Sequence, residues 1–152
     1  MNWTVTVLVA SLLIIPQEVS REIETVRQKD LKRHPGVEYG AFNIHVLKLD
    51  NGGIGSLRAL MIEIEVTNQD SETRDFDAGA LAFVDKEGRQ ISAREPSFKF
   101  LSGSEWYLGE PVSIHPGAKQ KFKVPFTGSL YLDKNIPTKL FYGDDLILRI
   151  IK

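Results

Sequence analysis

Four carboxylates within eight residues are the first side chains of this sequence that could do chemistry. They lie in the segment QDSETRDFD and are Asp70, Glu72, Asp75 and Asp77. Calcium is a hard cation that takes about six to eight oxygen ligands, so clustered carboxylates suit it. The segment lacks the Asp-x-Asp-x-Asp-Gly spacing of a calcium loop, and acidic residues at turns are commonly just hydrated. The sequence therefore leaves two alternatives here, a calcium site or a solvated connection between strands.

Two neighbouring aromatic residues, Trp106 and Tyr107, are the second candidate site. They lie in the irregular stretch Phe98–Leu108, which also contains glycine and serine. Long irregular loops in compact domains are often functional, and Trp and Tyr dominate contact surfaces. The stretch thus predicts a surface that binds a protein or a glycan through Trp106 and Tyr107. The alternative is packing, with these two side chains covering one end of the core.

The residues that most catalytic mechanisms need are missing or scattered. The chain has no cysteine, which excludes thiolate nucleophiles, disulfides and iron–sulfur clusters. Its three histidines, His34, His45 and His115, lack metal-ligand spacing, and there is no GxSxG motif or phosphate-binding loop. We therefore expect no enzyme activity and no cofactor. The alternative is a small hydrolase whose site is assembled from distant residues.

The charged residues are nearly balanced, with 19 Lys and Arg against 20 Asp and Glu. This composition lacks the basic footprint of a nucleic-acid binder, so no nucleic-acid partner is expected. Lys119, Lys121 and Lys123 alternate along one predicted strand. They could form a stripe for a polyanion such as a cell-wall polymer. Alternatively, they protect a sheet edge against aggregation.

The amino-terminal segment predicts the location of the protein. No charged side chain precedes Glu18, and Val5–Ile15 is almost continuously apolar. As a helix, residues 3–15 would span about 20 Å, against about 30 Å of hydrocarbon core. We expect a signal peptide or short membrane anchor over residues 1–16, and so an extracytoplasmic protein, secreted or on the cell surface. It would touch a membrane only through this segment, if uncleaved; the alternative is a buried strand.

The next segment, residues 17–36, predicts a helical linker. Between Glu18 and Arg33 the acidic residues come early and the basic residues come late, which suits the helix dipole. Val19, Ile23 and Val26 form an apolar stripe too narrow for a core helix. The sequence His34-Pro35-Gly36 would end it.

From Val37 onward the pattern is that of strands. In Leu60–Thr67, apolar residues alternate strictly with polar ones, apart from Met61, which indicates one buried and one wet face. Seven or eight short strands with turn signals between them predict an all-β fold, an antiparallel Ig-like β-sandwich over residues 37–152. The expected strands begin near Phe42, Leu57, Ala80, Gln90, Val112, Phe122, Lys139 and Leu146.

Three runs of residues carry a resemblance: VTNQDSETRDFDAGALAFVDKEGRQI, IHPGAKQKFKVPF and KLFYGDDLILRI. They resemble the Ig-like, telokin-like domains of uncharacterised exported bacterial and archaeal proteins, over roughly Val37–Lys152. The matching turn positions are Asn68, Asp85, Gly88, Pro116 and Gly117. The resemblance implies an extracytoplasmic location and no established activity. Many such proteins are tethered through a lipidated cysteine, which this chain lacks.

Together these features predict a non-enzymatic extracytoplasmic module that binds a protein or a cell-envelope component. One alternative is a calcium- or glycan-binding surface module, and the other is the small hydrolase.

Overall fold

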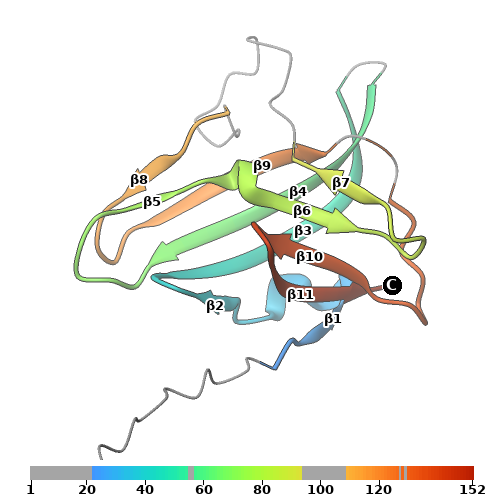
Figure 1. Ribbon diagram of the computed structural model, residues 1–152, viewed down its shortest axis with the longest axis horizontal. Coiled ribbons are helices and arrows are strands. Elements are labelled where there is room, and N and C mark those ends of the chain that lie inside the picture. Colours follow the sequence, from blue (N-terminus) through green and yellow to red (C-terminus); the bar gives the residue numbers. More distant parts are fainter. Residues whose placement is uncertain (1–21, 55–56, 94–108, 127, 129) are drawn as a thin grey trace, which may run out of the picture.

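The protein is all-β in the computed structural model, which describes residues 22–54, 57–93, 109–126, 128 and 130–152. Within these residues there are strands and two short 3-10 helices (Figure 1). The elements are β1 (Thr25–Arg27), η1 (Gln28–Arg33), β2 (Val37–Tyr39), β3 (Phe42–Ile54), β4 (Leu57–Asn68), β5 (Arg74–Phe76), η2 (Ala78–Ala80), β6 (Leu81–Val84), β7 (Gln90–Ser92), β8 (Val112–Ile114), β9 (Lys119–Phe126), β10 (Thr138–Tyr142) and β11 (Asp145–Ile151).

The described strands form three sheets. The largest has the order β1-β11-β10-β6-β7, the second β2-β3-β4-β9, and β5 pairs with β8. Every pairing between these strands is antiparallel except that of β1 with β11. In Figure 1, β6, β10 and β11 cross in front of β3 and β4, so the two larger sheets lie in separate layers. The predicted all-β, antiparallel character is confirmed.

The alternation in β4 places one row of side chains in the core. Leu60, Ile62, Ile64 and Val66 are buried, whereas the residues between them are partly exposed. In β9, Phe122, Val124 and Phe126 lie opposite Ile64, Ile62 and Leu60, and all three are also buried. The matching period of two on neighbouring strands fixes the register, because a shift by one residue would turn every apolar side chain to water.

Aromatic rings join the layers across the core. Phe83 of β6 and Phe126 of β9 belong to different sheets, and their ring centroids are 4.9 Å apart at an interplanar angle of 64°. At the other end Phe76 of β5 contacts Phe122 at 5.4 Å. Burying such a ring is worth about 1.5–3 kcal/mol, and an edge-on or tilted pair adds about 0.5–1.5 kcal/mol. These contacts hold the sheets face to face.

The wet face of the four-stranded sheet carries alternating charges. Glu63 lies between Lys48 and Lys123, and Glu65 lies opposite Lys121 in the strand register. Lys119 Nζ is also 3.4 Å from a carboxylate oxygen of Glu65. Because β9 is at the end of its sheet, these lysines are both cross-strand partners of glutamates and a charged edge. The structure favours edge protection over a free polyanion stripe.

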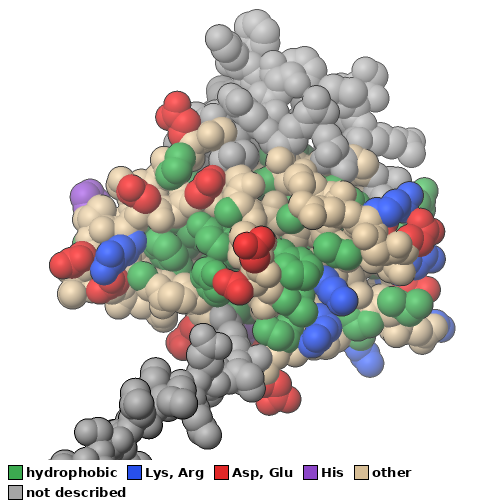
Figure 2. Space-filling view, in the orientation of Figure 1, with side chains coloured by type: hydrophobic (Ala, Val, Ile, Leu, Met, Phe, Trp, Pro, Cys, Tyr) green, Lys and Arg blue, Asp and Glu red, His purple; other side chains and the backbone are tan. Residues whose placement is uncertain are grey.

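On the outer face of the largest sheet, polar and apolar side chains are mixed. In the view of Figure 2, hydrophobic side chains over β6 and β10 are interspersed with acidic and basic ones. Such a mixture is typical of a sheet face that is exposed to solvent.

The structure differs from the predicted helical linker over residues 17–36 in the part that it describes. Residues 25–27 form β1, and residues 28–33 form a 3-10 helix. Val26 and Leu31 are buried, so a strand and one tight turn cover the core where an α-helix would present only a thin apolar stripe. Since β1 pairs with β11, the described part of this segment belongs to the β domain, and the predicted boundary at residue 37 falls within the fold.

The predicted signal peptide or anchor over residues 1–16 lies outside the described residues. Within the described residues, no helix is long and apolar enough to cross a membrane.

Candidate functional site

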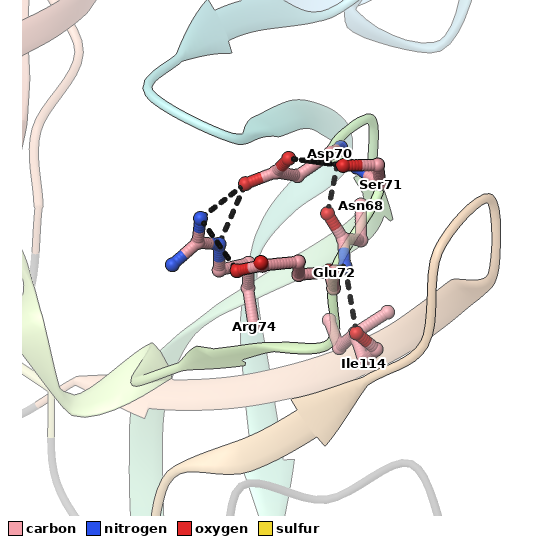
Figure 3. Close-up of polar contacts among 6 residues, drawn as sticks. All are labelled: Asn68, Asp70, Ser71, Glu72, Arg74 and Ile114. Atoms are coloured by element: carbon pink, nitrogen blue, oxygen red, sulfur yellow. Dashed lines mark hydrogen bonds and ion pairs between the residues drawn. The ribbon is translucent and has the colours of Figure 1, made fainter.

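The loop between β4 and β5 holds two of the predicted calcium ligands, Asp70 and Glu72, and Asn68 organises it (Figure 3). Asp75 lies in β5 and Asp77 directly after it. Asn68 is fully buried. Its Nδ2 donates to the carbonyl oxygens of Glu72 at 2.7 Å and Ile114 at 2.8 Å. Its Oδ1 accepts from the backbone N–H of Asp70 at 2.9 Å. All of these bonds are internal, so the amide ties β4, the loop and β8 together.

An arginine occupies the position that a cation would take beside Asp70. The Asp70 carboxylate accepts from Arg74 Nε at 2.6 Å and from the Ser71 N–H at 2.7 Å (Figure 3). Arg74 Nη2 also lies 3.3 Å from a carboxylate oxygen of Glu72. The hydrogen bond from Arg74, followed by that from Ser71, lowers the pKa of Asp70. The single guanidinium thus pairs with both carboxylates.

The other two predicted ligands point to different partners. Asp75 accepts a hydrogen bond from Ser113 Oγ at 2.5 Å, on the strand beside it. Asp77 caps η2 by accepting from the Gly79 N–H at 2.8 Å. The structure therefore does not bring Asp70, Glu72, Asp75 and Asp77 together around one point. In the described part of the chain no group of three or more His, Asp or Glu side chains is arranged to hold a metal ion.

Each histidine also contacts a different part of the chain. His34 contacts Glu24, His45 contacts the carbonyl oxygen of Leu31, and His115 Nδ1 lies 3.0 Å from Thr73 Oγ1. These contacts anchor neighbouring segments to the body. The predicted aromatic site, Trp106 and Tyr107, lies outside the described residues.

A hollow along β3 is the surface feature that the sequence did not predict. It has a volume of about 190 Å³ and lies between β3 and the segment Leu130–Leu132. Gln28 closes one side, where its Nε2 donates to the carbonyl oxygen of Leu49 at 2.7 Å. Tyr131 lies at the opposite wall with 66% of its surface exposed. A large aromatic side chain thus borders an open hollow without being used by the core.

A second hollow, of about 450 Å³, continues the first along β3. Both are lined by Gln28, Leu49, Asp50 and Lys152, and we call the two together the β3 groove. The second part adds Leu47 and three further lysines, Lys29, Lys32 and Lys48.

The β3 groove is positively charged. Its lining carries four lysines and one aspartate, a net side-chain charge of +3. Lys48 Nζ lies 2.7 Å from Asp50, whose hydrogen bond and charge raise the pKa of Lys48. Among the described residues, Lys29, Lys32 and Lys152 take part in no ion pair. Three ammonium groups thus face water beside an apolar floor.

No local motif could have revealed this groove, because its residues come from η1, β3, the loop after β9 and the last residue after β11. The one available signal was Tyr131 in the turn-rich stretch SLYLDKN, where an aromatic residue stands among loop formers.

Comparison of the chain with known protein families, with curated proteins and with solved structures finds no match.

Proposed function

We propose that the protein is a non-enzymatic Ig-like module that binds a protein or a cell-envelope component outside the cytoplasm. The β3 groove is the observation that carries the binding proposal. It combines an open hollow, an exposed Tyr131 and three lysines that form no ion pair with any residue the structure describes, Lys29, Lys32 and Lys152. Tyrosine is enriched at interface centres because it offers a large rigid contact area with a hydroxyl at its end.

The strand order supports the Ig-like part of the proposal. An Ig sandwich places its first, second and fifth strands on one sheet, and its third, sixth and seventh on the other. In this chain β3, β4 and β9 are neighbours in one sheet, and β6, β10 and β11 are neighbours in the other. The order of these six strands along the chain then follows the Ig order, with β4 followed by β6 and β9 followed by β10. The fourth Ig strand, which lies beside the fifth, has no counterpart in that place, because β7 pairs with β6 instead. The resemblance to telokin-like domains agrees with it.

The extracytoplasmic location is supported by the sequence, through the uncharged apolar segment of residues 1–16. Fractionation of expressing cells, with the mass of the amino terminus measured in each fraction, tests it. A product in the cell envelope or the medium that lacks about the first 16–20 residues is expected for a signal peptide. A full-length product found only in the cytosol contradicts the location.

The calcium alternative receives no support from the loop between β4 and β5, because Arg74 already pairs with Asp70 and Glu72. The binding proposal is tested by capture from a cell-envelope extract on the immobilised full chain. We compare the wild type with Tyr131→Ala and with a matched control, Ile136→Ala, whose side chain is 49% exposed and does not line the groove. Exposed substitutions of this kind change stability by no more than about 0.5 kcal/mol.

The expected result is a component retained by the wild type and by Ile136→Ala, and recovered about tenfold less on Tyr131→Ala. Equal recovery on all three proteins would remove the groove as the binding surface.

A further inference from the structure

We propose that the β3 groove binds an acidic polypeptide segment in extended conformation, which adds as a strand to the open edge of β3. This inference rests on the proposed binding function and names the chemistry of the ligand. Three observations carry it: an incompletely paired strand, a surplus of positive charge around it, and apolar residues in its lining.

The edge of β3 is paired over only a short length. β2 pairs with β3 at Phe42, Asn43 and Ile44, whereas β3 continues to Ile54 with β4 along its other side. η1 covers the next part of this edge, where the Gln28 side chain donates to the carbonyl oxygen of Leu49. From Asp50 onward the described residues place no further strand on this side.

The orientation of the backbone follows from that Gln28 bond. Because the Leu49 carbonyl accepts from Gln28, it points away from β4. In an antiparallel pair, residues alternate between bonding their neighbour and pointing both backbone groups outward. Asn51, two residues later, therefore presents its N–H and C=O to the groove. Such an edge is a template for an added strand, the mode by which several domains bind extended peptides.

The charge of the groove selects an acidic ligand. Lysines on an edge strand often serve only to prevent aggregation. Here Lys29 and Lys32 come from η1 and Lys152 follows β11, and all three are exposed in the structure. Lysines brought from other elements to face an open edge are better explained by attraction of a negative partner, which raises the association rate and selects the ligand.

The floor of the groove explains why a peptide fits better than a simple polyanion. Leu47, which is half-buried, lines it together with the lysines, whereas Leu49 is only 3% exposed and belongs mainly to the core. Successive side chains of a strand point to opposite faces, so a segment that alternates acidic and apolar residues sends one set to the floor and the other to the lysines. An anionic polymer without apolar groups would leave the exposed part of Leu47 in water.

The test uses a fluorescent eight-residue peptide of alternating Glu and Val, titrated against the full chain by fluorescence anisotropy. Two versions are methylated on the backbone nitrogens, one at every Glu and one at every Val. Both methylated peptides keep the negative charge of the parent peptide. In an added strand the N–H groups of either the Glu or the Val residues would face β3, so only one of the two methylated peptides loses the hydrogen bonds to β3. The protein variants are Lys29→Gln/Lys32→Gln/Lys152→Gln and a control, Lys121→Gln/Lys139→Gln, with lysines that do not line the groove. Thermal melting checks that all fold equally.

We expect the parent peptide to bind, with affinity that falls as NaCl rises from about 50 to about 500 mM. One methylated peptide and the triple variant should each weaken binding at least about tenfold, and the control variant should not. Amide hydrogen exchange at Asn51 should slow in the complex.

Three results would overturn the inference. Equal binding of both methylated peptides would mean charge attraction without strand addition. Inorganic polyphosphate binding more tightly than the peptide, with the same lysine dependence, would assign the groove to a polymer instead. No peptide binding at low salt would remove the acidic ligand altogether. If Tyr131-dependent capture from the envelope extract persists in that last case, the proposed function stands and this inference alone fails.

Discussion

Asn68 and Asp85 show how single polar residues hold the turns that follow β4 and β6. Asn68 makes three hydrogen bonds to backbone groups from a fully buried position. Asp85 Oδ1 accepts from the backbone N–H groups of Glu87 and Arg89 at 2.9 Å each, and its Oδ2 accepts from Arg89 Nε at 2.7 Å. These bonds give the chain reversals a fixed geometry, and both side chains were expected at turns from the sequence pattern.

Replacement of Asn68 by Ala should lower the free energy of unfolding by about 2–3 kcal/mol. It leaves the buried carbonyl of Ile114 and the N–H of Asp70 without their partner, and each unsatisfied buried group costs about 1–3 kcal/mol. Urea denaturation measures the change, and Gln69→Ala, at an exposed neighbour, is the matched control. A change below about 0.5 kcal/mol would show that the amide network is not structural.

Acid should destabilise the protein through Asp70 and Asp85. The pKa of Asp70 is lowered by Arg74 and Ser71. Burial raises the pKa of Asp85, but hydrogen bonds from Arg89 and Glu87 outweigh burial and leave it lowered. A lowered pKa in the folded state means that the stabilisation is present above about pH 4, the unfolded value, and is lost as pH falls through the folded values.

Thermal melting between about pH 7 and pH 2 measures this effect. The double variant Asp70→Asn/Asp85→Asn should be less stable than the wild type at pH 7 and should lose less stability on acidification. Parallel curves for the two proteins would mean that other carboxylates govern acid unfolding.

Among the elements, local pattern predicted those whose partners are close in sequence. The alternation of Leu60–Thr67 correctly gave β4 and its buried face, and the turn signals gave the β6–β7 and β10–β11 hairpins. The pattern missed β1, because that strand exists only through pairing with β11, more than a hundred residues later in the chain. The order of charges in this segment suits a helix dipole, but the burial of Val26 and Leu31 has more influence on its conformation.

Leu31→Ala tests whether η1 belongs to the core. The side chain is 1% exposed, so its truncation should lower the free energy of unfolding by about 2–5 kcal/mol through lost burial and the cavity that is left. Lys32→Ala, exposed on the same turn, should change it by no more than about 0.5 kcal/mol. Urea denaturation of the full chain compares the two. If both variants match the wild type, this segment is a linker as the charge pattern suggested.

At the scale of the molecule, the two larger of the sheets in the described residues share one core, and a charged groove lies along the edge of β3. Residues of the groove are far apart in sequence, so neither spacing nor periodicity could predict it. In the acidic segment that resembled a site, Arg74 pairs with Asp70 and Glu72. The carboxylates that the sequence offered as a site thus have partners within the fold, whereas the groove, which the sequence did not indicate, is the better candidate surface.

Site-specific photo-crosslinking in the native host tests this claim most directly. A photoreactive phenylalanine analogue, which keeps an aromatic ring at the position, replaces Tyr131 in one protein. In a second it replaces Lys121 in β9, at the opposite edge of the four-stranded sheet. We expect a crosslinked partner at position 131 that is absent at position 121, and whose yield falls about tenfold in the variant Lys29→Gln/Lys32→Gln/Lys152→Gln. The same partner at both positions with equal yield, or no partner at position 131, would contradict it.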